Sequence, residues 1–331
     1  MRAVIVEEFG QPEDLKFKDI PSPEPQPDEV VIDVKAVGVN FVDLLVIGGR
    51  YQFLPERPFT PGKLPVGVVC KLGRNVTSLA LGDRVVTMAE HGGYAEQVAV
   101  RAADCFRLSD SMPFVDAASM ALGFDTAWFA LHERGRLRKG EVVLVLGATG
   151  AVGLAAIQFA KAAGAKVLAG VSSLAKSAKV IAAGADEVVD LSAPDLQNAL
   201  RARVLELTKG HGADVVIDLL GDRYFAAAIR AMAWCGRLVV VGFAGGEIPT
   251  LKINYVLLKN IEISGLQISD YRKRRPEMFD DYFSMLFSLY ESGQIKPAET
   301  LVLPLEGAAE GLRMLRDRTT DKRIVLAPRA S

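Results

Sequence analysis

The stretch VVLVLGATGAVGLAAIQFAKAAG, residues 142–164, decides the fold class of this chain. Its first five residues are all apolar, as in a strand that is buried on both faces. From residue 151 to residue 163 the apolar side chains recur at helical spacing. The three glycines Gly147, Gly150 and Gly153 therefore stand where a strand turns into a helix, which is the context that a dinucleotide-binding turn requires.

Each glycine of this turn has a physical use if the turn holds a dinucleotide. Glycine lets the backbone approach a pyrophosphate, and the N–H groups and dipole of a helix N-terminus favour its negative charge. The missing side chain at Gly153 also lets the helix pack closely on the strand. The alternative is a tight strand-to-helix turn that binds no ligand. The predicted strand before the turn and the predicted helix after it favour the dinucleotide.

Downstream of this turn, apolar strands alternate with amphipathic helices up to about residue 266. Strands that are apolar throughout and alternate with helices are typical of a doubly wound parallel sheet covered on both faces. The expected strands are residues 166–171, 187–190, 213–220, 237–243 and 261–266, and the expected helices are residues 176–183, 195–208 and 222–234. A further helix is predicted at Met278–Tyr290.

The first 120 residues follow a different pattern. Short strands rich in β-branched residues, such as 29–39 and 66–73, are separated by glycine and proline, and residues 21–29 hold four prolines. Closely spaced strands of this kind indicate a small barrel or sandwich rather than a parallel sheet. The predicted fold is therefore α/β, with a doubly wound Rossmann sheet joined to a β domain.

The composition bounds the class of protein. A chain of 331 residues suits about two domains, because single cores stop growing near ~250–300 residues. Its 39 basic and 40 acidic residues leave a net charge of −1, which provides no broad cationic field for nucleic acid. The three cysteines form no CxxC pair, which argues against a disulfide framework and against a cysteine-rich zinc site.

The N-terminus and the hydropathy pattern bear on location. The sequence turns acidic after its first six residues, and no apolar run approaches the ~18–20 residues of a membrane span. We therefore expect neither a secretory signal nor a membrane helix. A cytoplasmic location is the simplest expectation.

The end of the second parallel strand indicates which dinucleotide binds. A carboxylate about 20 residues after the glycine turn would accept from the ribose of NADH and repel a 2′-phosphate. Residues 166–176, KVLAGVSSLAK, contain no carboxylate and offer Ser172, Ser173 and Lys176 instead. Hydroxyls and an ammonium can donate to a phosphate, so we expect NADPH to bind more tightly than NADH. In the alternative, which can hold at the same time, Ser172 caps the next helix and Lys176 is solvated.

Several motifs resemble those of one known family and occur in its order. They are GVNFVDLL (38–45), GGRY (48–51), LGDRV (81–85), GGYAE (92–96), GATGAVG (147–153), GADVVIDLLG (212–221) and GRLVVVGFAGGEIP (236–249). The chain resembles, nearly end to end, the zinc-independent branch of the medium-chain dehydrogenase/reductase superfamily, the NADPH:quinone oxidoreductases that include zeta-crystallin. Such a match is specific for fold and cofactor and much less so for substrate, since one fold hosts many chemistries.

The resemblance implies a discontinuous domain arrangement. Residues 1–123 and 267–331 would form the two parts of a GroES-like β-barrel catalytic domain, and residues 124–266 would form an NADP-binding Rossmann domain inserted between them. The strand pattern by itself predicts two consecutive domains. Members of the family commonly pair through the edge strand of the Rossmann sheet, which implies a homodimer that pairs through IEISG, residues 261–265.

The resemblance also implies roles for individual residues. Asn40 and Tyr51 would face the nicotinamide and the substrate as catalytic residues. The remaining cofactor-binding residues would be Thr126 beside the cofactor, Gly147, Gly150, Ala151, Val152 and Gly153 at the pyrophosphate, Ser172 and Lys176 at the adenosine phosphate, Asp222, and Val241, Gly242, Phe243, Ala244, Leu266 and Gln267 near the nicotinamide.

The predicted chemistry uses no metal. Zinc-dependent relatives take ligands from a cysteine near the position of Asn40 and a histidine near that of Lys63, and an amide and an ammonium do not replace thiolate and imidazole. The remaining chemistry is hydride transfer to electron-poor carbon of a quinone or an α,β-unsaturated carbonyl, whose oxygen becomes negative. Asn40 or Tyr51 could donate a hydrogen bond to that oxygen. In the alternative, Asn40 only fixes a loop and Tyr51 is a packed aromatic.

Two other functions stay open at this point. An enoyl-thioester reductase would use the same cofactor and fold, and a nucleotide-binding scaffold without activity would keep only the cofactor site. The basic run Arg272–Arg275 is expected to be a solvated loop, or else a cationic rim that attracts an acidic substrate or a cofactor phosphate.

Overall fold

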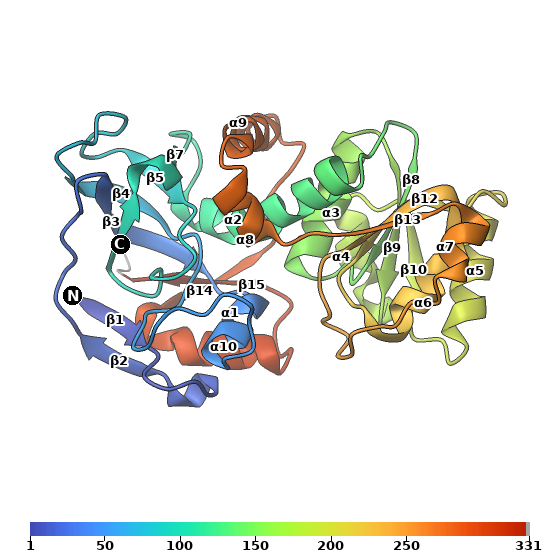
Figure 1. The fold of residues 1–331 in the computed structure, drawn as a ribbon, viewed down its shortest axis with the longest axis horizontal. Coiled ribbons are helices and arrows are strands. Elements are labelled where there is room, and N and C mark those ends of the chain that lie inside the picture. The colour runs from blue at the N-terminus through green and yellow to red at the C-terminus, as the bar shows by residue number, and fades with distance from the viewer. Residues whose placement is uncertain (329–331) are drawn as a thin grey trace. The chain divides into compact units, whose positions relative to one another are not determined.

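The computed structural model describes residues 1–328, which form two compact units (Figure 1). Unit 1 contains Met1–Leu122, Arg272–Glu291 and the chain from Lys296 onward. Unit 2 contains Gly123–Tyr271 and Ser292–Ile295. The chain therefore begins in unit 1, passes through unit 2 and returns to unit 1.

Unit 2 is built on a six-stranded parallel sheet in the order β10-β9-β8-β11-β12-β13. Its strands are β8 (Val142–Leu146), β9 (Lys166–Val171), β10 (Glu187–Asp190), β11 (Ala213–Asp218), β12 (Met232–Val240) and β13 (Glu262–Gly265). The chain runs outward from β8 through β9 to β10 and then restarts on the other side of β8 with β11. The structure thus confirms the predicted Rossmann sheet and places its switch point at the glycine turn.

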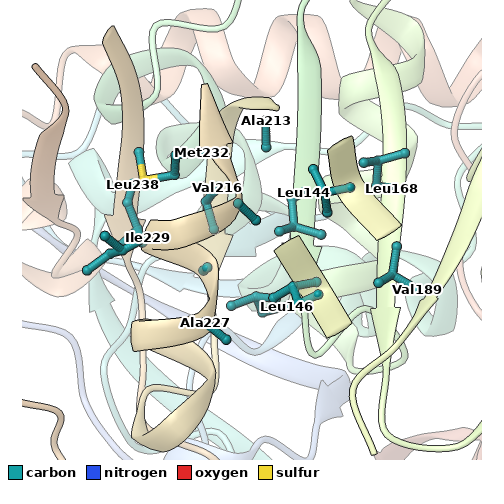
Figure 2. Close-up of a cluster of buried hydrophobic side chains, with 14 of the residues drawn as sticks. Leu144, Leu146, Leu168, Val189, Ala213, Val216, Ala227, Ile229, Met232 and Leu238 are labelled. Atoms are coloured by element: carbon teal, nitrogen blue, oxygen red, sulfur yellow. The ribbon is translucent and has the colours of Figure 1, made fainter. Parts of the chain in front are cut away.

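Helices cover both faces of this sheet. They are α3 (Ala151–Ala162), α4 (Ser177–Ala182), α5 (Leu196–Leu207), α6 (Asp222–Ala231) and α7 (Asn254–Lys259), with the 3-10 turn η4 (Leu174–Lys176). Figure 2 shows one hydrophobic layer, in which Leu144 and Leu168 from neighbouring strands belong to the same cluster as Ile229 of α6. Leu200 of α5 joins this cluster. Val143, which alternates with Leu144, is buried on the opposite face, where α3 contacts β8 and β9.

The boundary between α6 and β12 differs from the sequence prediction. The sequence pattern predicts a helix that reaches Trp234, but α6 ends at Ala231 and β12 begins with the next residue. Met232 pairs with Ala213 of β11, and Cys235 has a φ of +59°, which a right-handed helix cannot contain. Pairing with the neighbouring strand therefore overrides the helical pattern of the last three residues of the predicted helix.

Unit 1 contains a seven-stranded sheet in the order β14-β15-β3-β4-β5-β7, in which β6 also pairs with β3. Its strands are β3 (Glu29–Gly38), β4 (Val66–Leu72), β5 (Arg84–Thr87), β6 (Gln97–Arg101), β7 (Cys105–Arg107), β14 (Thr300–Pro304) and β15 (Arg323–Ala327), and β1 (Arg2–Ile5) forms a separate antiparallel pair with β2 (Lys16–Asp19). Strand β3 pairs antiparallel with β4, β6 and β15. The predicted β domain is confirmed, and two strands from the C-terminal segment complete it.

Unit 1 also has helices that the sequence pattern does not indicate, and one of them precedes Tyr51. This helix, α1 (Phe41–Ile47), follows β3 and begins where the N–H of Asn40 donates to the carboxylate of Asp43 at 2.8 Å. A carboxylate three residues after the N-cap is a local helix start signal. The other helical segments of unit 1 are α9 (Met278–Glu291), α10 (Ala308–Arg316), η1 (Pro12–Asp14), η2 (Ala102–Asp104) and η5 (Leu305–Gly307). Helices α2 (Phe114–Trp128) and α8 (Ile268–Arg274) each belong partly to unit 1 and partly to unit 2, and η3 (Phe129–Arg134) belongs to unit 2. Helix α9 confirms the helix predicted at Met278–Tyr290.

The lengths of these helices bear on membrane insertion. Across residues 1–328, we find no helix with the length and apolar character that crossing a bilayer requires.

Candidate active site

The glycine turn at the N-terminus of α3 is shaped for close approach of a ligand. A Cβ atom on Gly153 would lie 2.5 Å from the carbonyl oxygen of Gly147, so α3 can pack on the end of β8 only with glycine there. Gly150 is the exposed N-cap of α3, and within residues 1–328 a Cβ atom on it would meet only that same oxygen, at 3.6 Å. The space beside Gly150 is therefore open. The N–H groups of Ala151 and Val152, in the first turn of α3, border it, and this arrangement fits a pyrophosphate.

The loops that follow β11, β12 and β13 lie at the same carboxyl edge of the sheet. The N–H of Gly242 donates to the carbonyl oxygen of Asp218 at 3.3 Å, and the N–H of Leu266 donates to that of Val240 at 2.9 Å. The structure therefore places one group of predicted residues at the edge that carries the glycine turn: Val241, Gly242, Phe243, Ala244, Leu266 and Gln267. Ligands of open α/β sheets bind outside this edge.

Thr126 and Asp222 belong to unit 2 as well. A Cβ atom on Gly123 of α2 would lie 3.3 Å from the backbone of Ala151, so the segment of α2 that carries Thr126 packs against the start of α3. Thr126 is buried, and its hydroxyl donates to Asp125 at 3.1 Å. Asp222 is the first residue of α6, which follows β11 at the carboxyl edge.

Asp218, the last residue of β11, is a buried carboxylate at this edge that sequence reasoning did not single out. Its Oδ1 accepts from the N–H groups of Leu220 and Gly221, each at 2.9 Å. Its Oδ2 is buried and has no hydrogen-bond partner among residues 1–328. Burial raises the pKa of the Asp218 carboxyl, although the two N–H donors oppose this effect. The signal in the sequence is a carboxylate directly after the apolar run 215–217, at the end of the strand.

Ser172 and Lys176 lie at the carboxyl end of β9. Ser172 is exposed and directly follows the strand, and Lys176 is half-buried at the end of η4. The N–H of Ala148 donates to the carbonyl oxygen of Gly170 at 3.1 Å, so the end of β9 lies beside the glycine turn. The N-cap of η4 is Ser173, and its side chain makes no capping bond. The alternative in which Ser172 caps this helical turn is therefore wrong.

Asn40 is the N-cap of α1 in unit 1, and two partners fix the orientation of its amide. Nη2 of Arg323 donates to Oδ1 of Asn40 at 2.6 Å, and Nδ2 of Asn40 donates to the carbonyl oxygen of Gly38 at 2.9 Å. A guanidinium has no acceptor and a carbonyl has no donor, so the amide cannot turn over without losing both bonds. Nδ2 carries a second hydrogen that these two contacts do not use.

Arg323 reaches Asn40 from β15 across Gly38. Its guanidinium also donates to the carbonyl oxygens of Val39 and Ser119. A Cβ atom on Gly38 would lie 2.5 Å from Nη2 of Arg323, so only glycine leaves room for this side chain. Burial lowers the pKa of the Arg323 guanidinium, although the neighbouring charge of Asp43 opposes this effect. The group that orients Asn40 therefore comes from the last strand of the described chain.

Tyr51 lies four residues after α1, against a buried ion-pair cluster. The ammonium of Lys63 lies 5.0 Å from the centroid of the Tyr51 ring and pairs with Glu90. Arg272 pairs with the other carboxylate oxygen of Glu90 at 2.6 Å. Although burial alone raises it, the charges of Arg272 and Lys63 lower the pKa of Glu90 to about 2. Arg272 is 5% exposed, so the expectation of a solvated loop is wrong for this residue.

The side chains at the positions of the zinc ligands have protein partners of their own. Asn40 is held by Arg323 and Gly38, and Lys63 is held by Glu90. Across residues 1–328, no group of three or more His, Cys, Asp or Glu side chains is arranged to hold a metal ion.

Comparison with known proteins places both units in one family. Residues 26–110 match the family model of the alcohol dehydrogenase GroES-like domain, and residues 151–286 match that of the zinc-binding dehydrogenase. The quinone oxidoreductase-like protein 2 of Mus musculus is 34% identical over 327 residues, which cover 98% of this chain and 92% of that protein. The quinone oxidoreductase of Homo sapiens is 34% identical over 314 residues, which cover 94% of this chain and 92% of that protein.

This chain belongs to the quinone oxidoreductase family.

Solved structures of quinone oxidoreductases have the same fold. The quinone oxidoreductase of Pseudomonas syringae pv. tomato superposes with a TM-score of 0.90 at 31% identity, over 99% of each chain. The Escherichia coli quinone oxidoreductase, solved in complex with NADPH, superposes with a TM-score of 0.90 at 27% identity, over 99% of this chain and 100% of that chain. The comparisons therefore confirm the fold that the motifs implied, a GroES-like domain together with a Rossmann sheet.

Sequence reasoning located Asn40 and Tyr51 but missed the buried groups around them. Asp43 accepts from the N–H of Asn40 at 2.8 Å and from the hydroxyl of Tyr94 at 2.9 Å, and burial raises the pKa of its carboxyl. The capping spacing from Asn40 could have indicated Asp43. Glu90 and Arg323 had no such signal, because each contacts its partners from a distant part of the sequence.

Substitution of Gly38 tests the packing that orients Asn40. We expect Gly38→Ala to lower the free energy of unfolding by ~1–3 kcal/mol, because its Cβ would displace the Arg323 guanidinium. Urea unfolding at pH 7 measures this loss. Gly265→Ala is the matched control, since its Cβ would come no closer than 4.0 Å to its nearest neighbour, the carbonyl oxygen of Val240. Equal stability of the two variants would contradict the packing argument.

Acid unfolding tests the ion-pair cluster around Glu90. The pKa of Glu90 is lowered from 4.5 to about 2 in the folded protein, so ionised Glu90 stabilises the fold above pH ~4.5 and loses this effect as the pH falls towards 2. We expect Glu90→Gln to lower the urea midpoint at pH 7 and to lower it less at pH 3. Glu24→Gln, which removes an exposed pair with Lys71, should change little at either pH. An equal loss for Glu90→Gln at both pH values would refute the assignment.

Proposed function

We propose that this protein is an NADPH-dependent, metal-independent reductase that transfers a hydride to a quinone or an α,β-unsaturated carbonyl. The observation that carries the proposal is the open glycine turn of α3, with a hydroxyl and an ammonium at the end of the neighbouring β9. This pairing suits a pyrophosphate together with a 2′-phosphate. The NADPH complex of the Escherichia coli quinone oxidoreductase supports the same cofactor here.

The residues of unit 2 would divide the cofactor between them. Gly147 and residues 150–153 would hold the pyrophosphate through backbone N–H groups, and Ser172 and Lys176 would hold the adenosine phosphate. The nicotinamide half would contact Val241, Gly242, Phe243, Ala244, Leu266 and Gln267. Thr126 and Asp222 would be further contacts of the cofactor. When bound, NADPH supplies the hydride, and the protein supplies binding and orientation.

Asn40 and Tyr51 would act on the acceptor oxygen. The second hydrogen of Asn40 Nδ2 and the hydroxyl of Tyr51 are hydrogen-bond donors that suit an oxygen on which negative charge develops. Because Arg323 and Gly38 fix the amide of Asn40, this donor is oriented before the acceptor arrives. One such donor is worth roughly 2.7–4 kcal/mol in the transition state in favourable cases.

The domain division, the location and the oligomeric state are part of the same proposal. We assign residues 1–123 and 267–331 to the catalytic domain and residues 124–266 to the NADP-binding domain, in a cytoplasmic protein.

A homodimer would pair through the free side of β13, since α7 just before it exposes Leu257 (77%) and Leu258 (70%). Light scattering should give twice the chain mass, and a monomer at micromolar concentration would contradict the dimer.

Oxidation of NADPH against a panel of acceptors tests the function. We expect turnover with quinones and α,β-unsaturated ketones and no loss in the presence of a chelator. Acyl thioesters that turn over far better than quinones would reassign the protein as an enoyl-thioester reductase. Binding of NADPH without oxidation by any acceptor would leave a nucleotide-binding scaffold.

Lys176→Ala tests the choice between the two cofactors. We expect the KM for NADPH to rise about tenfold and the KM for NADH to change little, because only NADPH has the 2′-phosphate that the ammonium would contact. Lys139→Ala is the control, since Lys139 is exposed before β8, at the opposite edge of the sheet. Equal increases in both KM values would remove the phosphate contact.

A further inference from the structure

Two lysines and two aromatic rings form a row in unit 1. The ammonium of Lys63 lies 5.0 Å from the centroid of the Tyr51 ring. The ring of Phe53 meets that of Tyr51 edge-on, with centroids 6.3 Å apart and planes at 73°. The ammonium of Lys273 lies 4.0 Å from the centroid of the Phe53 ring. The row therefore has a cation at each end, against the face of a ring.

Lys63, at the inner end of this row, is 4% exposed. A buried ammonium is costly unless it is paired and hydrogen-bonded. Glu90 supplies that pairing, and Glu90 is itself held by Arg272, which is also buried. The Lys63 ammonium is therefore fixed by a carboxylate on one side and borders the π face of Tyr51 on the other.

The backbone around Tyr51 offers little support of its own. Helix α1 ends at Ile47, Gly49 has a φ of +67°, and residues 50–58 contain no helix or strand. The position of the Tyr51 ring depends for this reason on side-chain contacts, which are its packing on a hydrophobic cluster of unit 1 and its contacts with Lys63 and Phe53. Cation–π attraction is strongest when the cation is desolvated, as Lys63 is here.

We infer that Lys63 is a positioning residue of the acceptor site, whose ammonium holds the Tyr51 ring so that its hydroxyl faces the acceptor oxygen. The inference rests on the proposed function, because it gives Tyr51 the role of a hydrogen-bond donor. Glu90 acts one step further away, by holding Lys63, and Arg272 acts in turn by holding Glu90. Lys63 is buried against the face of the Tyr51 ring, and it therefore acts on turnover through Tyr51. The binding of NADPH to unit 2 does not depend on it.

Coupling between Lys63 and Tyr51 is the first test. We expect Lys63→Met to lower kcat with a quinone about tenfold, without changing the dissociation constant of NADPH measured by fluorescence. Lys63→Arg should restore most of the activity, since it keeps the cation. In a Tyr51→Leu background, Lys63→Met should cause no further loss. Equal losses in the two backgrounds, or no loss in either, would overturn the inference.

The mobility of the Tyr51 ring is the second test, and it needs no turnover. Protein labelled with 3-fluorotyrosine gives a ¹⁹F signal that Tyr51→Phe assigns to Tyr51. We expect this signal to shift and narrow towards that of a mobile ring in Lys63→Met, and to stay in place in Lys63→Arg. Lys71→Met, which removes an ion pair with Glu24 and a hydrogen bond to the carbonyl oxygen of Pro23, both away from the Tyr51 ring, is the matched control. An unchanged signal in Lys63→Met would refute the positioning role.

The two tests separate this inference from the proposed function. If the wild type reduces quinones and Tyr51→Leu is as active, the positioning role fails and the reductase assignment stands. If no acceptor is reduced, the reductase assignment fails, and the inference fails with it even where the ¹⁹F signal shows that Lys63 holds the ring.

Discussion

The contact between Gly153 and the carbonyl oxygen of Gly147 is the constraint on which unit 2 depends. The two residues approach so closely that no side chain fits between them, and α3 therefore begins directly on the end of β8. This approach sets the N-terminus of α3 at the switch point of the sheet, beside the ends of β9 and β11. A bulkier residue at position 153 would move α3. The other residues at this edge would then no longer lie beside the N-terminus of α3.

Unit 1 solves a different physical problem, because its candidate donors lie among buried charges. The guanidinium of Arg323 holds Asn40, and the ammonium of Lys63 borders Tyr51. Both buried cations are bonded to nearby acceptors, Arg323 to backbone carbonyl oxygens and Lys63 to Glu90. Buried polar networks of this kind stabilise little in total but specify one arrangement of their members. The amide of Asn40 is therefore oriented by Arg323 and Gly38, whereas Tyr51 lies against a separate group of paired charges.

The sequence predicted unit 2 well because its signals are local. The apolar run 142–146, the glycine turn and the following helix are adjacent in the chain, so their pattern survives without knowledge of the fold. The predicted end of α6 was wrong because the pairing of Met232 with β11 depends on a distant strand and leaves no local signal in the sequence. Asn40 and Tyr51 came from motif resemblance, whereas Glu90 and Arg323 meet their partners across distant parts of the chain and leave no periodic trace.

The pairing of Arg323 with Asn40 spans 283 positions of the sequence. A ribosome releases the chain from its N-terminus, so every strand of the parallel sheet has emerged before β15 does. Until then β3 lacks its partner at Gly38, and an apolar strand edge stays exposed to other nascent chains and to chaperones. A chain cut before β15 thus carries a finished parallel sheet and an unfinished β domain.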